Sequence, residues 1–101
     1  MTTVYRFGRF ELQPKQRRLL NDGDPVELGH RAFDVLSVLV ERAGQLVTKD
    51  QLLGLVWPGV IVEENNLQVQ VSTLRKNQGT AAIATTAGRG YCFTLELTPG
   101  T

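Results

Sequence analysis

The sequence predicts an α+β domain in which a small antiparallel sheet is followed by three helices and then by a β-hairpin. Three observations support this prediction. Short strand-like runs flank a turn signal within residues 4–28, apolar residues recur at helical spacing within 30–79, and glycines interrupt a strand-like run within 83–97.

The bulk properties are those of one ordinary globular domain spanning 1–101. A chain of 101 residues, 42% hydrophobic and 21% charged, can bury a single modest core. No apolar run approaches the ~18 residues of a transmembrane helix and no signal peptide is recognisable, so no membrane contact is expected. The single Cys92 cannot form an internal disulfide, which fits a cytoplasmic protein. The formal net charge is +1, so a nucleic-acid surface would depend on where the charges lie, not on their sum.

Residues 4–28 predict the N-terminal sheet. The run 4–12 mixes aromatic and charged residues and predicts one or two short strands around Gly8. A second run at 17–20 and a third at 25–28 flank Asn-Asp-Gly-Asp, a strong turn signal because Asn and Asp-Gly tolerate positive φ. The basic residues of this region are expected on a solvated sheet face: Arg6, Arg9, Lys15, Arg17 and Arg18.

Two amphipathic helices are predicted next. Apolar residues at i, i+3, i+4 and i+7 spacing predict the first over 31–43, with Gly44 where a helix-ending residue of positive φ is common. A short strand at 46–47 could follow. Thr48 and Gln51 have the spacing of a capping box, which would start the second helix, and Pro58 would stop it. The buried side of that helix is expected to contain Leu52, Leu53, Val56 and Trp57.

The segment 63–76 permits two interpretations. Its centre, LQVQV, alternates like a half-buried strand, whereas Leu67, Val71 and Leu74 have the spacing of one helix face. A strand of 14 residues would far exceed the usual ~5–6. Acidic residues at its start and basic residues at its end also suit the helix dipole. We therefore predict a third helix over about 63–78, ended by Gly79.

The side of this helix opposite Leu67 is rich in amides and hydroxyls, with Val69 at its centre. One interpretation is a solvated face with a stray valine, which is common. The other is a DNA recognition helix, because Asn and Gln pair with adenine in the major groove and a small apolar side chain can meet a thymine methyl. A β-branched residue is a poor choice for an exposed helix position, which favours the second interpretation. The candidate base-reading residues are Asn65, Asn66, Gln68, Val69, Gln70, Ser72 and Thr73.

Residues 83–101 predict a β-hairpin followed by the end of the folded domain. Residues 83–97 predict two strands around 87–90, where two glycines permit the positive φ of a tight turn. Residues 98–101 look like a frayed end or the start of a linker, which would make this chain the N-terminal part of a longer protein.

Together these segments resemble the winged-helix DNA-binding domain of the OmpR/PhoB type, the effector module of many bacterial response regulators. The resemblance runs from Tyr5 to about Leu97. It is carried by FGRFELQPKQRRLLNDGDPVEL, by RAFDVLSVLVERAGQLVTKDQLLGLVWP, by VEEN followed by LRK, and by the ending I-x-T-x-x-G-x-G-Y-x-F. Each piece alone is weakly specific, but their order and spacing together are a strong signal.

The resemblance implies a winged helix-turn-helix with a four-stranded N-terminal sheet, a three-helix bundle and a wing hairpin. It implies transcription regulation in signal transduction by sequence-specific binding of double-stranded DNA, with the third helix in the major groove and the wing tip at the minor groove. The wing-tip residues would be Gly88, Arg89 and Gly90, and phosphate contacts are expected from Thr48, Arg75, Lys76 and Thr85. RNA polymerase contact through the 58–64 loop and head-to-tail dimers on direct repeats are further implications.

Some positions depart from the family pattern. Ser72 and Thr73 stand where many relatives have basic residues, Ala87 stands where Arg or Lys is common, and Gln78 replaces a common core leucine. Losing such cations should weaken phosphate contacts and reduce the salt dependence of binding. Each neutralised phosphate contributes about 0.9 to the slope of log K against log salt concentration. Arg89 could supply the minor-groove cation instead.

Other functional classes have less support. The sequence has no Ser-His-Asp set, no paired catalytic carboxylates and no phosphate-binding glycine loop, so we expect neither an enzyme nor a cofactor. His30 has no second His or Cys near it, so no metal site is expected. The runner-up function is a protein-protein interaction module in which Trp57, Val69 and the apolar loop 60–62 form a docking patch.

Overall fold

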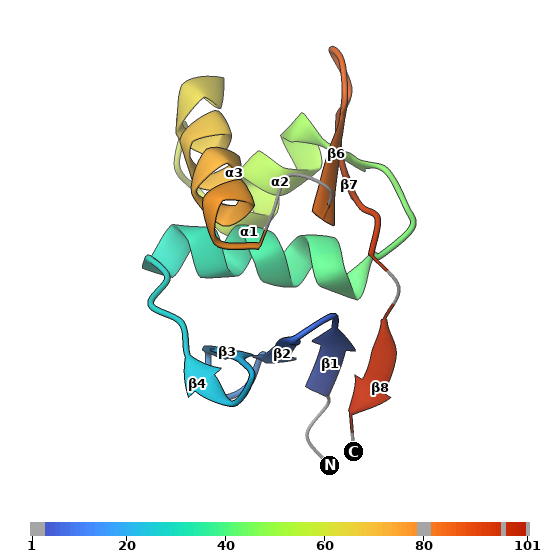
Figure 1. Cartoon of the computed structure of the whole chain (residues 1–101). Helices are drawn as coiled ribbons and strands as arrows, with labels where there is room; N and C mark the ends of the chain where they lie inside the picture. The colour runs from blue at the N-terminus through green and yellow to red at the C-terminus, as the bar shows by residue number, and fades with distance from the viewer. Residues whose placement is uncertain (1–3, 79–81, 96, 101) are drawn as a thin grey trace.

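The computed structural model describes residues 4–78, 82–95 and 97–100. In Figure 1, α1 lies across the middle of the molecule, with a five-stranded sheet on one side and α2, α3 and the wing on the other. The elements are β1 (Val4–Phe7), β2 (Phe10–Gln13), β3 (Arg18–Asn21), β4 (Asp24–Pro25), α1 (His30–Glu41), β5 (Val47–Thr48), α2 (Lys49–Val56), α3 (Glu64–Gln78), β6 (Ile83–Thr86), β7 (Gly90–Phe93) and β8 (Thr98–Gly100). The predicted order of sheet, three helices and hairpin is confirmed.

The first sheet has the antiparallel order β4-β3-β2-β1-β8. The turn predicted before β4 is present, with positive φ at Asp22 (51°) and Gly23 (86°), the combination that a two-residue hairpin turn requires. The strand expected over 25–28 is shorter and earlier, Asp24–Pro25. Beyond it the Val26 N–H still donates to the Leu19 carbonyl of β3 at 2.8 Å, and Val26 and Leu28 pack against the core.

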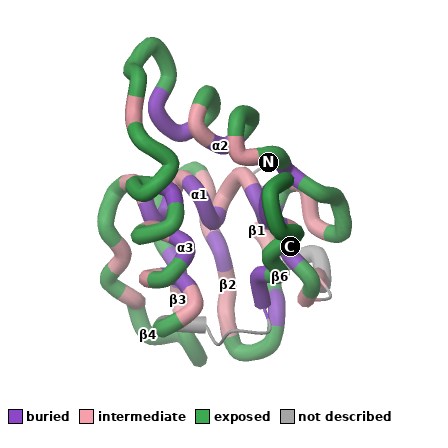
Figure 2. Tube along the Cα trace, turned by 90° about the horizontal axis from the view of Figure 1, so that it is seen from above, coloured by how far each residue is buried: buried purple, intermediate pink, exposed green. Residues whose placement is uncertain are grey.

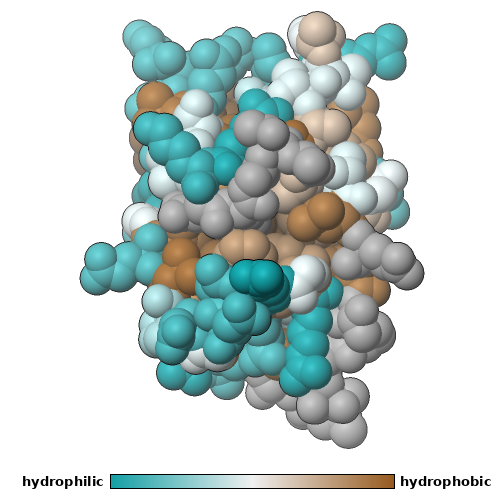
Figure 3. Space-filling view, viewed as in Figure 1, coloured by the Kyte–Doolittle hydropathy of each residue, from teal (hydrophilic) through white to brown (hydrophobic). Residues whose placement is uncertain are grey.

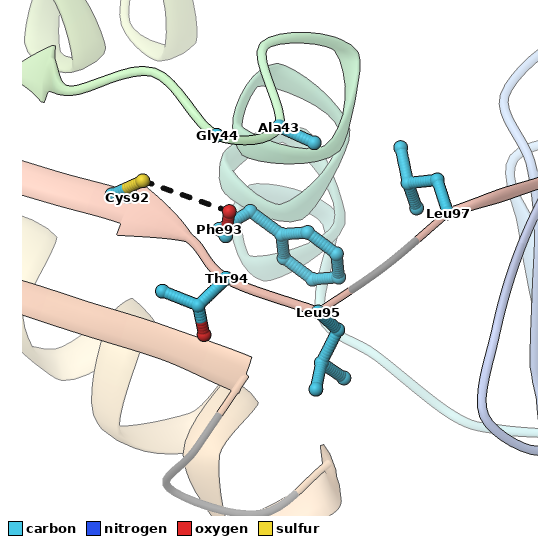
Figure 4. A pocket seen from close by; sticks show the side chains of 7 residues that line it. All are labelled: Ala43, Gly44, Cys92, Phe93, Thr94, Leu95 and Leu97. Carbon is cyan, nitrogen blue, oxygen red and sulfur yellow. Dashed lines mark hydrogen bonds between the residues drawn. The ribbon is translucent and has the colours of Figure 1, made fainter.

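The chain after the wing corrects three expectations. The hairpin ends at Phe93 and not at 97, because Leu95 and Leu97 pack against the core in the segment that follows β7 (Figure 4). Residues 98–100 are not frayed but form β8, in which Gly100 pairs with Val4. The sheet therefore has five strands and not four, and β8 covers the edge of β1, whose N–H and C=O groups would otherwise be unpaired.

The helices begin and end close to the predicted residues. The capping box that starts α2 is present: the Gln51 amide N–H donates to Thr48 Oγ1 at 3.1 Å, and the Thr48 N–H donates to Gln51 Oε1 at 3.0 Å. α1 ends at Glu41, two residues earlier than predicted, and Gly44 (φ 82°) lies in the turn beyond it. Gly79, the expected end of α3, lies outside the described residues.

One core joins all layers. Buried stretches of α1, α3 and the strands lie inside the molecule, and exposed stretches run along the loops (Figure 2). The Phe7 ring of β1 meets the Phe93 ring of β7 edge to face at 5.0 Å, a favourable aromatic arrangement that connects the two sheets. On the surface, apolar residues are visible mainly between the helices above and the sheet below (Figure 3). Among the described residues, no helix is long and apolar enough to cross a membrane.

The second sheet has the order β5-β7-β6, so the predicted short strand is present at Val47–Thr48 and turns the hairpin into three strands. Gly90 of β7 pairs with Thr48. A Cβ atom placed on Gly90 would lie 2.0 Å from the Val47 carbonyl oxygen and 2.8 Å from Thr48 Cα. Only glycine therefore allows this approach of the two backbones.

We expect Gly90→Ala to lower the free energy of unfolding by about 1–3 kcal/mol, because the methyl group must displace backbone. Urea denaturation measures the change. Gly54→Ala is the matched control: no atom lies within 4 Å of a Cβ there, and alanine should stabilise the interior of α2 by about 0.5–1 kcal/mol. Equal effects of the two substitutions would contradict the close contact.

Candidate nucleic-acid interface

α3 has one buried side and one exposed side. Leu67, Val71 and Leu74 are buried in the core, whereas the Val69 side of the helix is open and Val69 itself is 51% exposed. The helical interpretation of this segment is therefore confirmed, and its strand-like alternation comes from two apolar positions on opposite sides.

The exposed side of α3 forms a hollow centred on Val69. It is lined by Asn65, Gln68, Val69, Ser72, Thr73 and Lys76, and we call it the α3 hollow. Five of the seven predicted base-reading residues therefore lie together. Of the other two, Asn66 is exposed and Gln70 is half-buried, and neither lines the hollow.

Two of the polar side chains in the α3 hollow already have partners within the helix. Gln68 Nε2 donates to Glu64 Oε2 at 3.4 Å, and Thr73 Oγ1 donates to the Val69 carbonyl at 3.0 Å. Within the described part of the chain, the side chains of Asn65 and Ser72 have no such bond. Their hydrogen-bonding groups are therefore available to a ligand.

Arg75 has a structural role that the sequence did not reveal. Its guanidinium donates to the Ile83 carbonyl at 2.9 Å and also to Thr85 Oγ1, so two predicted phosphate-binding residues bond each other. These bonds connect the last turns of α3 to β6. Lys76, the next residue, is exposed and is the better placed of the two cations for a phosphate.

The wing tip is held by the start of α2. The Arg89 carbonyl accepts the Lys49 backbone N–H at 3.1 Å, and the Arg89 N–H donates to the Thr86 carbonyl at 3.0 Å. Gly88 between them has φ 74°, as expected for the turn, and the Arg89 side chain is exposed. Figure 1 shows the wing tip and the first turns of α3 at the same end of the molecule, away from the five-stranded sheet.

An ion pair connects the starts of α2 and α3. Lys49 Nζ lies 2.9 Å from Glu64 Oε1, and this hydrogen bond raises the pKa of Lys49 above its usual 10.5. The lysine is therefore charged at neutral pH. It offsets the one acidic side chain in the first turn of α3, a charge that would otherwise repel phosphate groups.

A second hollow lies beside the α2–α3 loop, lined by Leu53, Gly54, Trp57, Gly59, Val60, Ile61 and Val62. Trp57 is buried, as expected for a core residue, and the Arg31 guanidinium lies 5.8 Å from its ring centre. Ile61 is fully exposed. Val69 lines a different hollow, so the single docking patch of the runner-up hypothesis is divided into two surfaces.

A third hollow, between the end of α1 and the segment after β7, contains the half-buried Cys92 (Figure 4). Its Sγ lies 3.6 Å from the Phe93 carbonyl oxygen. In the described ranges, no group of three or more His, Cys, Asp or Glu side chains could hold a metal ion.

Residues 23–93 match the family model described as "Transcriptional regulatory protein, C terminal". Over 93 residues the chain is 34% identical to the phosphate regulon transcriptional regulatory protein PhoB of Pseudomonas aeruginosa, an alignment that covers 88% of this chain and 41% of PhoB. The chain thus spans less than half the length of this curated relative.

Solved structures share the arrangement. The DNA-binding domain of Klebsiella pneumoniae RstA, solved in complex with the RstA box, is similar with a TM-score of 0.76 and 31% identity, over 90% of this chain and 96% of that one. The DNA-binding domain of Escherichia coli CadC has a TM-score of 0.79 at 24% identity over 95% of each chain, which shows the common fold.

Arg75→Ala should lower the free energy of unfolding by about 1.5 kcal/mol, because the Ile83 carbonyl loses its charged donor. Hydrogen exchange of the β6 amides should accelerate. Lys76→Ala, which removes the neighbouring exposed cation, should change stability by less than about 0.5 kcal/mol. If both variants unfold at the same urea concentration, the bonds from Arg75 do not hold the wing.

Proposed function

The chain belongs to the OmpR/PhoB-type family of transcriptional regulatory proteins, and we propose that it regulates transcription by sequence-specific binding of double-stranded DNA. The observation that supports this most directly is the α3 hollow, an exposed set of amide, hydroxyl and aliphatic side chains on a rigid helix. The wing tip lies at the same end of the molecule as the first turns of α3 (Figure 1).

In this proposal α3 enters the major groove, which admits an α-helix. The wing tip reaches the adjacent minor groove, where the negative potential attracts Arg89. Lys76 at the end of α3 and Thr48 at the start of α2 contact phosphates and fix the position of the protein on the duplex. Arg75 and Thr85 act mainly by holding β6 against α3.

Few cations are free on this surface, so a single copy should bind with modest affinity. Two copies arranged head to tail on direct repeats would bind more tightly if they touch each other, since that contact holds the second copy beside its own half-site. We therefore propose direct repeats as the form of the operator. Because bacterial chromosomal DNA is cytoplasmic, we place the chain in the cytoplasm, and we propose no enzymatic activity or cofactor for it.

We further propose that the loop over 58–64 contacts RNA polymerase. Ile61 is fully exposed and Val60 is 58% exposed beside a hollow lined mainly by apolar residues. Exposed apolar side chains that adjoin one another mark protein interaction sites more often than isolated ones do.

The salt dependence of DNA binding tests the proposed phosphate contacts. Lys76→Ala and Arg89→Ala should each reduce the slope of log K against log salt by about 0.9, as expected for the loss of one neutralised phosphate. Fluorescence anisotropy with duplex DNA between 50 and 200 mM salt measures this slope. Arg6→Ala is the control, because Arg6 lies on the five-stranded sheet in an ion pair with Glu11. Salt-independent affinity of the unaltered chain would refute the proposed function.

Ile61→Ser should leave the affinity for DNA unchanged and weaken the ternary complex of chain, promoter DNA and RNA polymerase severalfold. The reason is the loss of an exposed apolar contact. A gel-shift titration with purified polymerase measures the ternary complex. Leu55→Ser, which alters a half-exposed leucine of α2, is the control. Unchanged polymerase recruitment by Ile61→Ser would exclude this contact.

A further inference from the structure

The side chains on the exposed start of α3 determine which base pairs it can read. In the major groove, guanine is bound by Arg or Lys, cytosine by Asp or Glu, adenine by Asn or Gln, and the thymine methyl by an apolar side chain. With α3 in the major groove as proposed, the side chains that it leaves without a partner in the protein decide which of these bases it binds.

Side chains that can bind adenine and the thymine methyl lie together in the α3 hollow. Asn65 and Val69 are four residues apart and therefore on one side of the helix, separated by about 6 Å along its axis. That separation corresponds to one or two base-pair steps of about 3.4 Å. The Asn65 amide has no side-chain partner among the described residues, and Val69 is 51% exposed.

Three cations near α3 could bind guanine. Two of them already have partners in the protein, and the third lies far from Val69. The Arg75 guanidinium is bonded to the Ile83 carbonyl, and the Lys49 ammonium is paired with Glu64 at 2.9 Å. Lys76 lines the far end of the α3 hollow, seven residues and about 10 Å beyond Val69, where a helix end meets the phosphate backbone. No other lysine or arginine belongs to the described part of α3.

The remaining polar groups do not favour G·C either. Glu64, the residue that could accept from cytosine, already accepts from Lys49 and from Gln68. The Thr73 hydroxyl donates its hydrogen to the Val69 carbonyl, so it is not available as a donor to guanine O6. Ser72 is exposed, but a hydroxyl bonds to any base and does not discriminate.

We propose that the half-site bound by this helix is centred on A·T pairs, with Val69 against a thymine C5-methyl and Asn65 bonded to the N6 and N7 atoms of an adenine one or two steps away. This inference rests on the proposed function and adds the class of DNA sequence to it. The specificity is carried by an aliphatic contact and an amide, not by arginine.

The experiment begins with selection of bound duplexes from a random pool by the 101-residue chain. The selected half-site should contain A·T pairs at the positions protected by α3. Each thymine in it is then replaced by uracil, which removes only the C5-methyl, and each adenine by 7-deazaadenine, which removes only the N7 acceptor. Anisotropy titrations at fixed salt give the affinity for each duplex.

One uracil substitution should weaken binding about fourfold, the effect of one buried methyl group. One deazaadenine substitution should weaken it about tenfold. Val69→Ala, which removes two methyl groups, should reduce the uracil effect and keep the deazaadenine effect. Asn65→Ala should abolish the deazaadenine effect and keep the uracil effect. Leu55→Ala is the control, since it shortens an aliphatic side chain of similar exposure (50%) that does not line the α3 hollow, and it should keep both effects.

The outcomes separate this inference from the proposed function. Strong, salt-dependent binding to a half-site with G·C pairs under α3 overturns the A·T assignment and leaves the function intact. A uracil effect that is equal in the unaltered chain and in Val69→Ala also overturns it. A pool from which no sequence is enriched overturns the proposed function together with the inference. Thermal unfolding verifies that each variant is folded, as expected for substitutions at exposed positions.

Discussion

The candidate interface depends on the contact between Gly90 and the backbone of Val47 and Thr48. A side chain at position 90 would overlap the Val47 carbonyl oxygen, so the wing lies directly against the segment that starts α2. The same segment caps α2 through Thr48 and bonds the wing tip through the Lys49 N–H. The Lys49 side chain then reaches Glu64 at the start of α3. Three consecutive residues therefore fix the relative positions of the wing, α2 and α3.

The ion pairs and hydrogen bonds of this structure determine how many cations a chain of net charge +1 leaves exposed on the proposed DNA-binding surface. Several cations stabilise the fold: Arg75 bonds β6, Lys49 pairs with Glu64, and Arg17 of the N-terminal region pairs with Asp34 of α1. On the proposed binding surface, Lys76 and Arg89 are exposed. In the proposed complex, non-specific attraction to phosphate would consequently be weak, and contacts with base edges would supply a larger share of the binding free energy.

The elements that sequence predicts well are those whose signals are local. The capping box joins residues three apart, and Leu67, Val71 and Leu74 orient α3 by their spacing alone, which also predicted the exposure of Val69. The missed features join distant residues. The pairing of Gly100 with Val4 extends the first sheet, although nothing near residue 100 indicates a strand partner at the other end of the chain. Likewise, the groups that accept hydrogen bonds from Arg75 lie in β6. The position of Arg75 in the helical pattern of α3 therefore indicated only an exposed cation.

The separation of the two sides of α3 has a consequence for specificity. Stability depends on the buried side, where Leu67, Val71 and Leu74 pack into the core, and the exposed side contributes little to it. Under the proposed function, a change at Val69 or Asn65 would therefore alter what the helix binds without altering how it is held in the fold. Val69 costs the helix some intrinsic propensity, since a β-branched residue loses rotamer freedom there. That cost is offset only when the side chain meets an apolar partner, and in the major groove the thymine methyl is such a partner.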